Sequence, residues 1–246
     1  MKFHVLTLFP EMFPPVLGAS ILGRAERSGI LSFHYVNIRD YSRDPHNRAD
    51  DYSFGGGPGM VMMAEPIFGA MEAVDAGTKK VIYMSPRGKI ISREILESLA
   101  EELELVILCG HYEGVDQRVL DYWNAEELSI GDYIVTGGEL PAMVLMDSLS
   151  RLIPGVLASE EGAMGESVYS GLMEYPQYTR PRSFRGLEVP EILLSGDHRK
   201  IDLWRFEEAL RLTAERRPEL FEDFVKKHGE LPKDEQKVME KVLGML

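Results

Sequence analysis

Short apolar runs alternate with longer segments of helical periodicity through the first 150 residues. The short runs are rich in β-branched and aromatic residues and predict strands, whereas apolar positions that recur every three or four residues predict helices. We expect strands over residues 3–9, 31–38, 80–84 and 105–109, with a further short candidate at 134–136. We expect helices over residues 20–27, 65–76, 93–102, 115–123 and 139–152. This alternation is typical of an α/β domain with a largely parallel sheet.

The pattern changes after Pro154. Residues 155–190 are rich in glycine and proline and show no sustained period, which indicates a long linker or functional loop. Helical spacing returns over 197–217, and shorter helical segments follow it. We therefore expect three regions, namely an α/β domain over 1–160, a linker over 161–175 and a small all-α domain over 176–246.

The net charge of −13 argues at first against a polyanionic partner. The charge is unevenly placed, however, because residues 94–147 carry a balance of −12 and the other 192 residues sum to −1. Basic residues gather instead at 180–185, 198–200 and 216–217. The total charge therefore does not exclude RNA.

Other features of the composition narrow the class of protein. The single cysteine, Cys109, forms no internal disulfide or multi-cysteine zinc site and is expected to be buried. No apolar run approaches the roughly 18 residues of a membrane span, and residues 1–10 lack the features of a signal peptide. We expect a cytoplasmic protein that does not bind a membrane.

Three glycine-rich segments are candidates for ligand binding. Residues 50–60 hold four glycines in five positions, with neither the spacing of a nucleotide P-loop nor that of a dinucleotide-binding turn. Residues 109–116 follow a strongly apolar predicted strand, and ligands in α/β sheets bind beyond such strand ends. Residues 129–139 form a further glycine turn before a predicted helix, and the last two turns could enclose an adenosine through main-chain groups. A flexible turn and exposed loop residues are the simpler alternatives.

Charged residues downstream suggest proton chemistry only if they meet. Arg151 ends an apolar predicted helix, where it could simply cap carbonyl groups. Glu166 and Glu174 lie in the linker, where carboxylates are usually solvated. An acceptor carboxylate beside a fixed cation is what removal of a proton from a weakly acidic amide requires.

The ordered set of motifs resembles the TrmD family of bacterial tRNA (guanine-N1)-methyltransferases, in the SPOUT superfamily. The motifs run along nearly the whole chain: FPEMF (9–13), RDY (39–41), DDYSFGGGPGM (50–60), SPRG (85–88), CGHYEGVDQR (109–118), SIGDYIVTGGELPAM (129–143), RLIPGV (151–156), YTRP (178–181) and LLSGDH (193–198). Each motif alone is weakly specific, but the ordered set is highly specific.

The resemblance implies a deep trefoil knot in the α/β domain, which holds S-adenosylmethionine bent between three loops. It also implies a homodimer whose active site lies at the subunit interface. The cofactor-binding positions that it implies are Tyr83, Ser85, Pro86, Gly110, Tyr112, Glu113, Gly114, Ile130, Gly131, Tyr133, Val135, Gly137, Gly138 and Pro141.

The implied reaction is methyl transfer to N1 of guanosine 37 in tRNA, next to the anticodon. Arg151 then faces the charge that develops on guanine O6, and Glu166 is the general base at a position where many relatives carry aspartate. The resemblance also implies Mg2+, with Glu113, Glu166 and Glu174 as candidate ligands. Candidate tRNA-binding residues are Asp50, Gly55, Gly57, Gly59, Glu174, Arg180, Arg185, His198 and Arg199.

Three other functions compete with this one. The chain could be a SPOUT methyltransferase acting on another RNA position, or an RNA-binding relative that has lost catalysis. A nicotinamide or nucleotide enzyme on a doubly wound sheet is the third, although both phosphate-binding fingerprints are missing.

Overall fold

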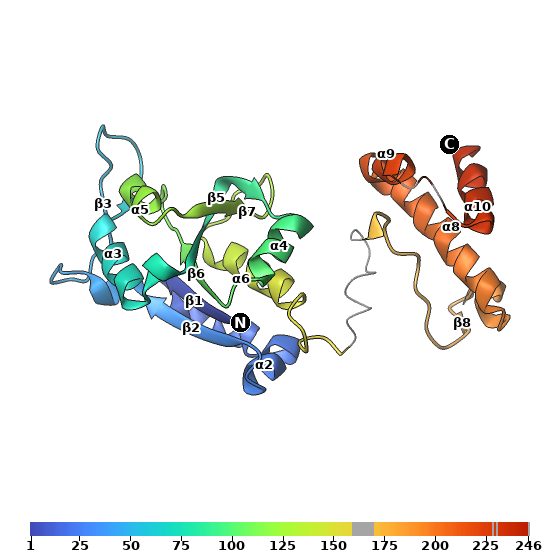
Figure 1. Ribbon diagram of the computed structural model, residues 1–246, viewed down its shortest axis with the longest axis horizontal. Helices are drawn as coiled ribbons and strands as arrows, with labels where there is room; N and C mark the ends of the chain where they lie inside the picture. Colours follow the sequence, from blue (N-terminus) through green and yellow to red (C-terminus); the bar gives the residue numbers. More distant parts are fainter. Residues whose placement is uncertain (159–169, 228, 230, 246) are drawn as a thin grey trace. The chain divides into compact units, whose positions relative to one another are not determined.

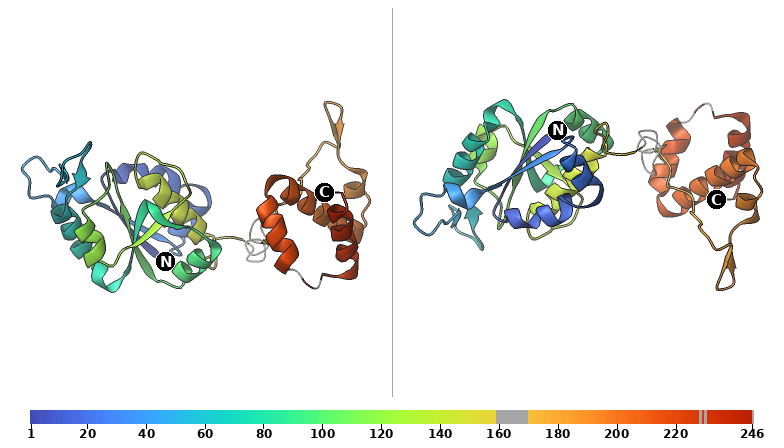
Figure 2. Two further views of the ribbon diagram at one scale, coloured as in Figure 1. Left: turned by 90° about the horizontal axis from the view of Figure 1, so that it is seen from above. Right: turned by 90° about the horizontal axis from the view of Figure 1, so that it is seen from below.

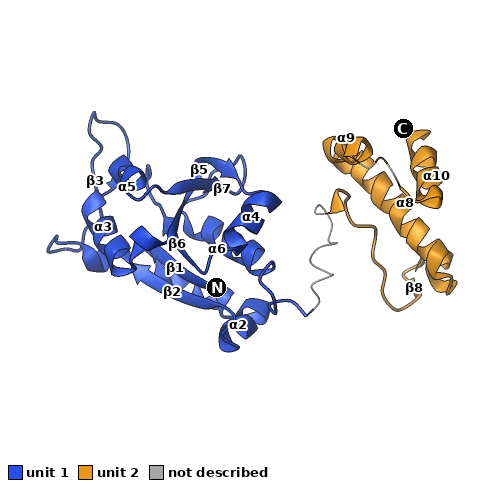
Figure 3. Cartoon of the chain, viewed as in Figure 1, with its two compact units in different colours: residues 1–160 blue, residues 161–246 orange. Residues whose placement is uncertain are grey.

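The computed structural model describes residues 1–158, 170–227, 229 and 231–245 (Figure 1). The chain divides into two compact units, residues 1–160 and 161–246 (Figure 3). Each unit is described by itself below.

Unit 1 is built around a parallel sheet of five strands in the order β2-β1-β6-β5-β7. The strands are β1 (Lys2–Thr7), β2 (Ser32–Asn37), β5 (Lys80–Ile90), β6 (Glu104–Cys109) and β7 (Glu126–Ser129). The predicted α/β class with a parallel sheet is confirmed.

Helices cover both faces of this sheet (Figure 2). Successive side chains of a strand point to opposite faces, so Leu105 and Ile107 pack on one face, whereas Val106 and Leu108 pack on the other. The first face is covered by α1 (Pro14–Leu17), α2 (Ser20–Arg27), α4 (Arg93–Ala100) and α6 (Glu139–Ser150), and the second by α3 (Ala64–Ala73) and α5 (Gln117–Tyr122). Short 3-10 turns occupy Pro10–Met12, Ile38–Tyr41 and Ala76–Thr78.

The last strand differs from the prediction. Residues 134–136 form no strand and lie in a loop, and the strand is β7 instead. Strand β7 begins with two glutamates, so it has no hydrophobic pattern. Glu126 forms ion pairs with Lys80 at 2.6 Å and with Lys89 at 3.8 Å. Pairing of charged residues with the neighbouring strand therefore substitutes for apolar character at this edge of the sheet.

A two-stranded hairpin, β3 (Asp50–Asp51) and β4 (Val61–Met62), carries the first glycine-rich segment at its tip. Gly55, Gly56, Gly57 and Gly59 all have positive φ angles, which L-residues with side chains rarely adopt. Glycine is thus required by the backbone here.

Unit 2 is mainly helical, with α8 (His198–Arg216), α9 (Pro218–Lys227), α10 (Lys233–Leu243) and a 3-10 turn at Glu191–Leu194. Leu210, Phe221, Phe224 and Val242 form its core with Leu172. In the described part of the chain, no helix is both long and apolar enough to cross a membrane.

The expectation of an all-α second domain is wrong in one detail. Strands β8 (Ser183–Phe184) and β9 (Leu187–Glu188) form a hairpin. Its two turn residues, Arg185 and Gly186, have φ angles of 55° and 82°. Two positive φ angles are the signature of a tight hairpin turn, and an isolated turn of this kind leaves no alternating pattern in the sequence.

Candidate functional site

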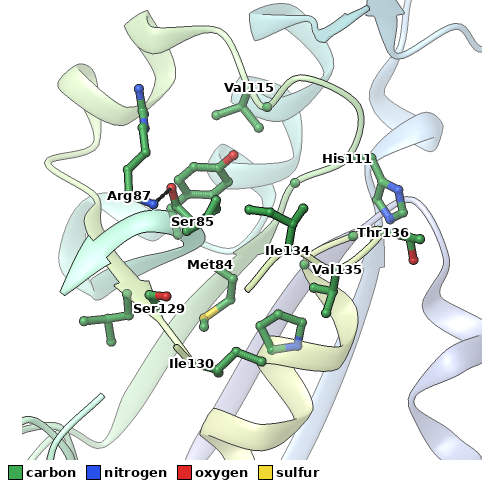
Figure 4. Close-up of a pocket in the computed structure, with 18 of the residues that line it drawn as sticks. Met84, Ser85, Arg87, His111, Val115, Ser129, Ile130, Ile134, Val135 and Thr136 are labelled. Carbon is green, nitrogen blue, oxygen red and sulfur yellow. Dashed lines mark hydrogen bonds between the residues drawn. The ribbon is translucent and has the colours of Figure 1, made fainter. Parts of the chain in front are cut away.

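A cavity of about 360 Å³ lies beyond the carboxyl end of β6 and at that of β7, beside the middle of β5 (Figure 4). Three chain segments form its walls: residues 83–87 of β5, residues 110–117 after β6, and residues 128–141 after β7. This is the edge of a parallel sheet at which ligands bind, and the volume lies within the range of small-molecule sites.

The structure brings together nearly all the residues predicted to hold a cofactor. Those that line the cavity are Tyr83, Ser85, Pro86, Gly110, Tyr112, Glu113, Gly114, Ile130, Tyr133, Val135, Gly137, Gly138 and Pro141. The exception is Gly131, which is not in the wall. Its φ of 145° and the tight approach of the Tyr133 ring show that it shapes the turn behind it.

Several wall residues were not among the predicted site residues: Met84, Arg87, His111, Val115, Gln117, Leu128, Ser129, Ile134 and Thr136. Met84 lies within β5 and Leu128 near the end of β7, and both are buried apolar residues whose pattern indicates core. Arg87 brings a cation, held 3.2 Å from a carboxylate oxygen of Glu127. Ligands bind at the ends of parallel strands. If every residue within two positions of a predicted strand end were a candidate, part of this set would be found.

Close packing of glycines fixes the shape of the cavity. A Cβ on Gly138 would lie 2.7 Å from the Cα of Cys109 and 2.8 Å from the amide nitrogen of Gly110. A Cβ on Gly110 would lie 2.7 Å from the hydroxyl of Tyr83. The two loops are also joined by a hydrogen bond that the Gly138 amide donates to the Gly110 carbonyl at 2.8 Å. Main chain therefore packs directly on main chain.

Burial affects the pKa of two side chains at this wall. Complete burial raises the pKa of the Cys109 thiol well above its ordinary value, as expected for an inert structural cysteine. Burial also raises the pKa of the Tyr83 phenol.

A buried polar chain supports the cavity from beneath. Glu139, which is 1% exposed, accepts a hydrogen bond from the Thr7 hydroxyl at 2.5 Å and lies 2.6 Å from Nε2 of His111. The His111 ring also packs on Phe9, with centroids 4.9 Å apart. Because Thr7 belongs to β1, His111 to the loop after β6 and Glu139 to the start of α6, this chain ties three elements to one carboxylate.

The glycine loop of the first hairpin meets the loop after β6. The Glu113 amide donates to the Met60 carbonyl at 3.0 Å, and the Met62 amide donates to the Gly114 carbonyl at 2.9 Å. A Cβ on Gly59 would lie 2.6 Å from a carboxylate oxygen of Glu113. Asp50 lies on β3, at the base of the same hairpin.

The predicted catalytic residues are not gathered at this cavity. Arg151 is the residue at the C-terminal end of α6, whereas Pro141, near the start of α6, lines the cavity. At a rise of 1.5 Å per residue, the two backbone positions are about 15 Å apart along the helix. Glu166 lies outside the described residues, and Glu174 is exposed in unit 2.

The basic candidates of unit 2 occupy different settings. Arg180 and His198 line a second cavity. Arg185 sits in the hairpin turn, with its guanidinium 5.3 Å from the ring centroid of Phe184. Arg199 forms an ion pair with Asp234, which joins the start of α8 to α10.

No group of three or more His, Cys, Asp or Glu side chains within the described residues is arranged to hold a metal ion. Of the three predicted ligands, Glu113 and Glu174 belong to different units, and Glu166 is not described.

Comparison with known proteins identifies the family. The sequence model of the tRNA (guanine-1)-methyltransferase TrmD family matches residues 1–223. The chain belongs to the TrmD family. The match includes every loop that forms the first cavity, so these loops are part of the TrmD pattern.

Curated TrmD relatives resemble the chain over nearly their whole length. A tRNA (guanine-N(1)-)-methyltransferase of Ruminiclostridium cellulolyticum is 54% identical over 90% of this chain and 96% of its own. Enzymes with the same name from Alkaliphilus oremlandii and Halalkalibacterium halodurans are 52% and 48% identical, each with 98% of both chains covered.

Proposed function

We propose that this chain transfers a methyl group from S-adenosylmethionine to N1 of guanosine 37 in tRNA. The observation that supports this most strongly is that three loops, far apart in the sequence, assemble one cavity in a chain of the TrmD family. The relatives carry the name of a tRNA (guanine-N1)-methyltransferase, which supports the reaction class.

The wall of the cavity fits S-adenosylmethionine. Glycine-bearing turns expose main-chain groups that can bind the polar edge of adenine, and Met84, Leu128 and Ile130 supply apolar surface for its faces. When bound, S-adenosylmethionine supplies a methyl group on a positively charged sulfur. We infer that the loops bind and orient it, and that the His111–Glu139 pair holds two of these loops in register.

Guanine N1 bears a proton that has to leave when the methyl group arrives. We propose that the carboxylate of Glu166 accepts this proton and that the guanidinium of Arg151 faces the negative charge that develops on O6. Glu166 is one methylene longer than the aspartate of many relatives, and it keeps the carboxylate that this role requires.

A homodimer is the arrangement that best accounts for the position of Arg151. About 15 Å of helix separate Arg151 from the cavity of its own chain. We therefore infer that Arg151 acts at the cavity of a second copy. The exposed side of α6 supports this proposal, because Leu140 and Val144 are 50% and 48% exposed and lie one helical turn apart. Apolar side chains on an exposed helical face favour burial against a partner.

Two further features belong to the proposal. One is the knotted chain path that membership of the TrmD family implies, in which the Gly138 turn packs directly on Cys109. The contact between Gly59 and Glu113 supports a role of the glycine loop, with Asp50, Gly55 and Gly57, in holding the target guanine beside the cofactor.

Methyl incorporation into matched tRNA transcripts tests the reaction and its position. We expect labelled methyl groups to appear in a transcript with guanosine at position 37 and not in the transcript with adenosine there. Equal incorporation into both would identify a SPOUT enzyme with another target, and no incorporation into either would favour an RNA-binding relative without catalysis.

Single-turnover kinetics test the residue roles. We expect Glu166→Gln and Arg151→Ala each to slow methyl transfer at least about 100-fold at saturating tRNA and cofactor. Near-native rates in both variants would show that the roles are assigned to the wrong residues. Excess chelator tests the Mg2+ requirement, for which full activity would be the contradicting result.

A further inference from the structure

Unit 2 contains a second cavity, formed entirely by residues 175–205. It has a volume of about 600 Å³ and lies between the segment before the β8–β9 hairpin and the first two turns of α8. In the sequence, the segment 178–181 was a motif in which only Arg180 was a candidate tRNA-binding residue.

Aromatic rings line this cavity. The rings of Tyr178 and Trp204 have centroids 6.4 Å apart and are tilted by 51°, and Tyr178 is 48% exposed. Tyr175 lies in the same wall, under the guanidinium of Arg205 at 5.0 Å. Such rings provide flat apolar surface that is accessible from outside the fold.

Basic side chains also line the cavity. They are Arg180, Arg182, Arg205 and His198, and no aspartate or glutamate lies in the wall. Carboxylates contact two of them from outside the wall: Glu188 and Glu191 lie 3.9 and 3.8 Å from Arg182, and Asp202 lies 3.3 Å from Arg205. Arg180 lines the same wall and is exposed.

One donor in the wall is incompletely used. The Nε–H of Arg205 is buried and has no hydrogen-bond acceptor among the described residues. A buried donor without an acceptor is costly, and an oxygen of a ligand in this cavity would relieve that cost.

Aromatic faces together with cations and without carboxylates are the chemistry that binds single-stranded nucleic acid, because bases stack on the rings while phosphates meet the cations. We propose that this cavity binds one unstacked nucleotide of the substrate tRNA. Its base lies against Tyr178 and Trp204, and its phosphate lies at Arg180 and His198. The inference rests on the proposed function only in that the RNA is the tRNA that is methylated.

The two tryptophans of the chain make the site observable. Trp123 lies in unit 1 and Trp204 in the cavity, so fluorescence of the full-length Trp123→Phe variant reports on Trp204. We expect a single-stranded RNA of six adenosines to quench this emission in a saturable manner. An abasic hexamer with the same backbone should bind at least about fivefold more weakly.

Steady-state methylation connects the site to the reaction. We expect Tyr178→Ala to raise the KM for tRNA about 5- to 50-fold, the size of one lost stacking contact. The kcat and the affinity for S-adenosylmethionine should be unchanged, and Tyr178→Phe should restore the native KM. Tyr122→Ala is the control, because Tyr122 is a 70% exposed aromatic residue that lines neither cavity.

Each contrary result has a definite meaning. Methyl transfer with a native KM in Tyr178→Ala, or equal affinity for the abasic hexamer, would overturn the nucleotide site and leave the proposed function intact. Quenching by RNA in a protein that methylates no tRNA would overturn the proposed function and leave the site intact. Trp204 emission that changes with protein concentration in the absence of RNA would show that a second copy covers the cavity, which also overturns the proposal.

Discussion

The two cavities of this molecule are lined by different kinds of chemical group. The cavity of unit 1 is walled largely by the main chain of glycine turns and supported by a buried carboxylate. The cavity of unit 2 is lined by aromatic and basic side chains, of which Tyr178 is exposed. A wall of main chain suits a small ligand of fixed shape, whereas aromatic and basic side chains suit bases and phosphates.

The contrast also explains the charge distribution. Residues 94–147, which supply much of the first cavity, carry a balance of −12. Residues 175–205 carry six Arg or Lys residues and four Asp or Glu residues. An acidic protein can therefore offer RNA a locally basic surface, and its net charge predicts its partner poorly.

The largest expected effect comes from placing a side chain in the main-chain wall. Gly138→Ala puts a Cβ 2.7 Å from the backbone of Cys109, so one of the two loops has to move. We expect the affinity for S-adenosylmethionine to fall at least about 100-fold, with a loss of about 1–3 kcal/mol in the free energy of unfolding. Calorimetry and urea denaturation measure the two quantities.

Gly77→Ala is the matched control for this substitution. Its added Cβ would meet only the Trp123 ring, at an ordinary 3.7 Å, and affinity should stay native. Native binding by Gly138→Ala would contradict the claim that main-chain packing shapes the first cavity.

The next test compares how salt affects binding of tRNA and of S-adenosylmethionine. Raising monovalent salt from about 50 to 200 mM should weaken tRNA binding about 5- to 20-fold if two or three cations meet phosphates. Binding of S-adenosylmethionine should change less than about twofold, because no polyanion is involved. Filter binding for tRNA and calorimetry for the cofactor measure this, and equal salt dependence of both ligands would remove the contrast.

A smaller effect is expected from the carboxylate beneath the first cavity. Glu139→Gln removes the anion that faces His111 and weakens the hydrogen bond from Thr7. We expect cofactor affinity to fall about 3- to 10-fold and the free energy of unfolding to fall by about 1–3 kcal/mol, while RNA quenching of Trp204 stays native. Glu97→Gln, which alters an exposed pair with Arg93, is the control and should change neither quantity.

The smallest expected effect is a difference in response to acid. Burial lowers the pKa of His4 below its ordinary 6.5, although the hydrogen bond with Glu104 acts in the opposite direction. The unfolded chain therefore gains this proton at a higher pH than folded unit 1 does, so stability falls as pH decreases below 6.5. Lys2 and His34 also face His4 and oppose its protonation.

The acid response is measured separately for each unit. Urea denaturation at pH 7.5 and 5.5, followed through Trp123 in a Trp204→Phe background, should show this loss for unit 1, and His4→Gln should reduce it. The transition of unit 2, followed through Trp204, should not respond to His4→Gln. A pH response of unit 1 that is the same with and without His4 would contradict the assignment.

The sequence allowed much of unit 1 to be predicted, and the reason lies in apolar packing. Strands β1, β2 and β6 fall within two residues of their predicted limits, because β1 and β6 pack apolar side chains on both faces and the edge strand β2 adds Phe33, Tyr35 and Val36 to the core. Strand β7 was missed because an edge strand tolerates Glu126 and Glu127 when Lys80 and Arg87 lie alongside. Hydropathy detects burial, and pairing between charges leaves no such signal.

The candidate sites were also predicted only in part. Glycine turns after strands led to the first cavity, since strand ends of a parallel sheet share one edge. The contact between Thr7 and Glu139 joins residues 132 positions apart, and no local pattern encodes it. The aromatic cavity escaped prediction because Tyr178 and Trp204 come from an irregular segment and a helix, whose relative placement depends on folding.

The packing of Gly138 against Cys109 and Gly110 has a consequence for the evolution of drug resistance. An inhibitor that binds only main-chain groups of these loops meets a surface that substitution cannot easily alter, because a new side chain there collides with backbone before it reaches the inhibitor. Escape would have to come from outlying wall residues with free space around them, such as Ile134, which is 79% exposed. Compounds that avoid contact with that side chain should therefore select resistant variants least often.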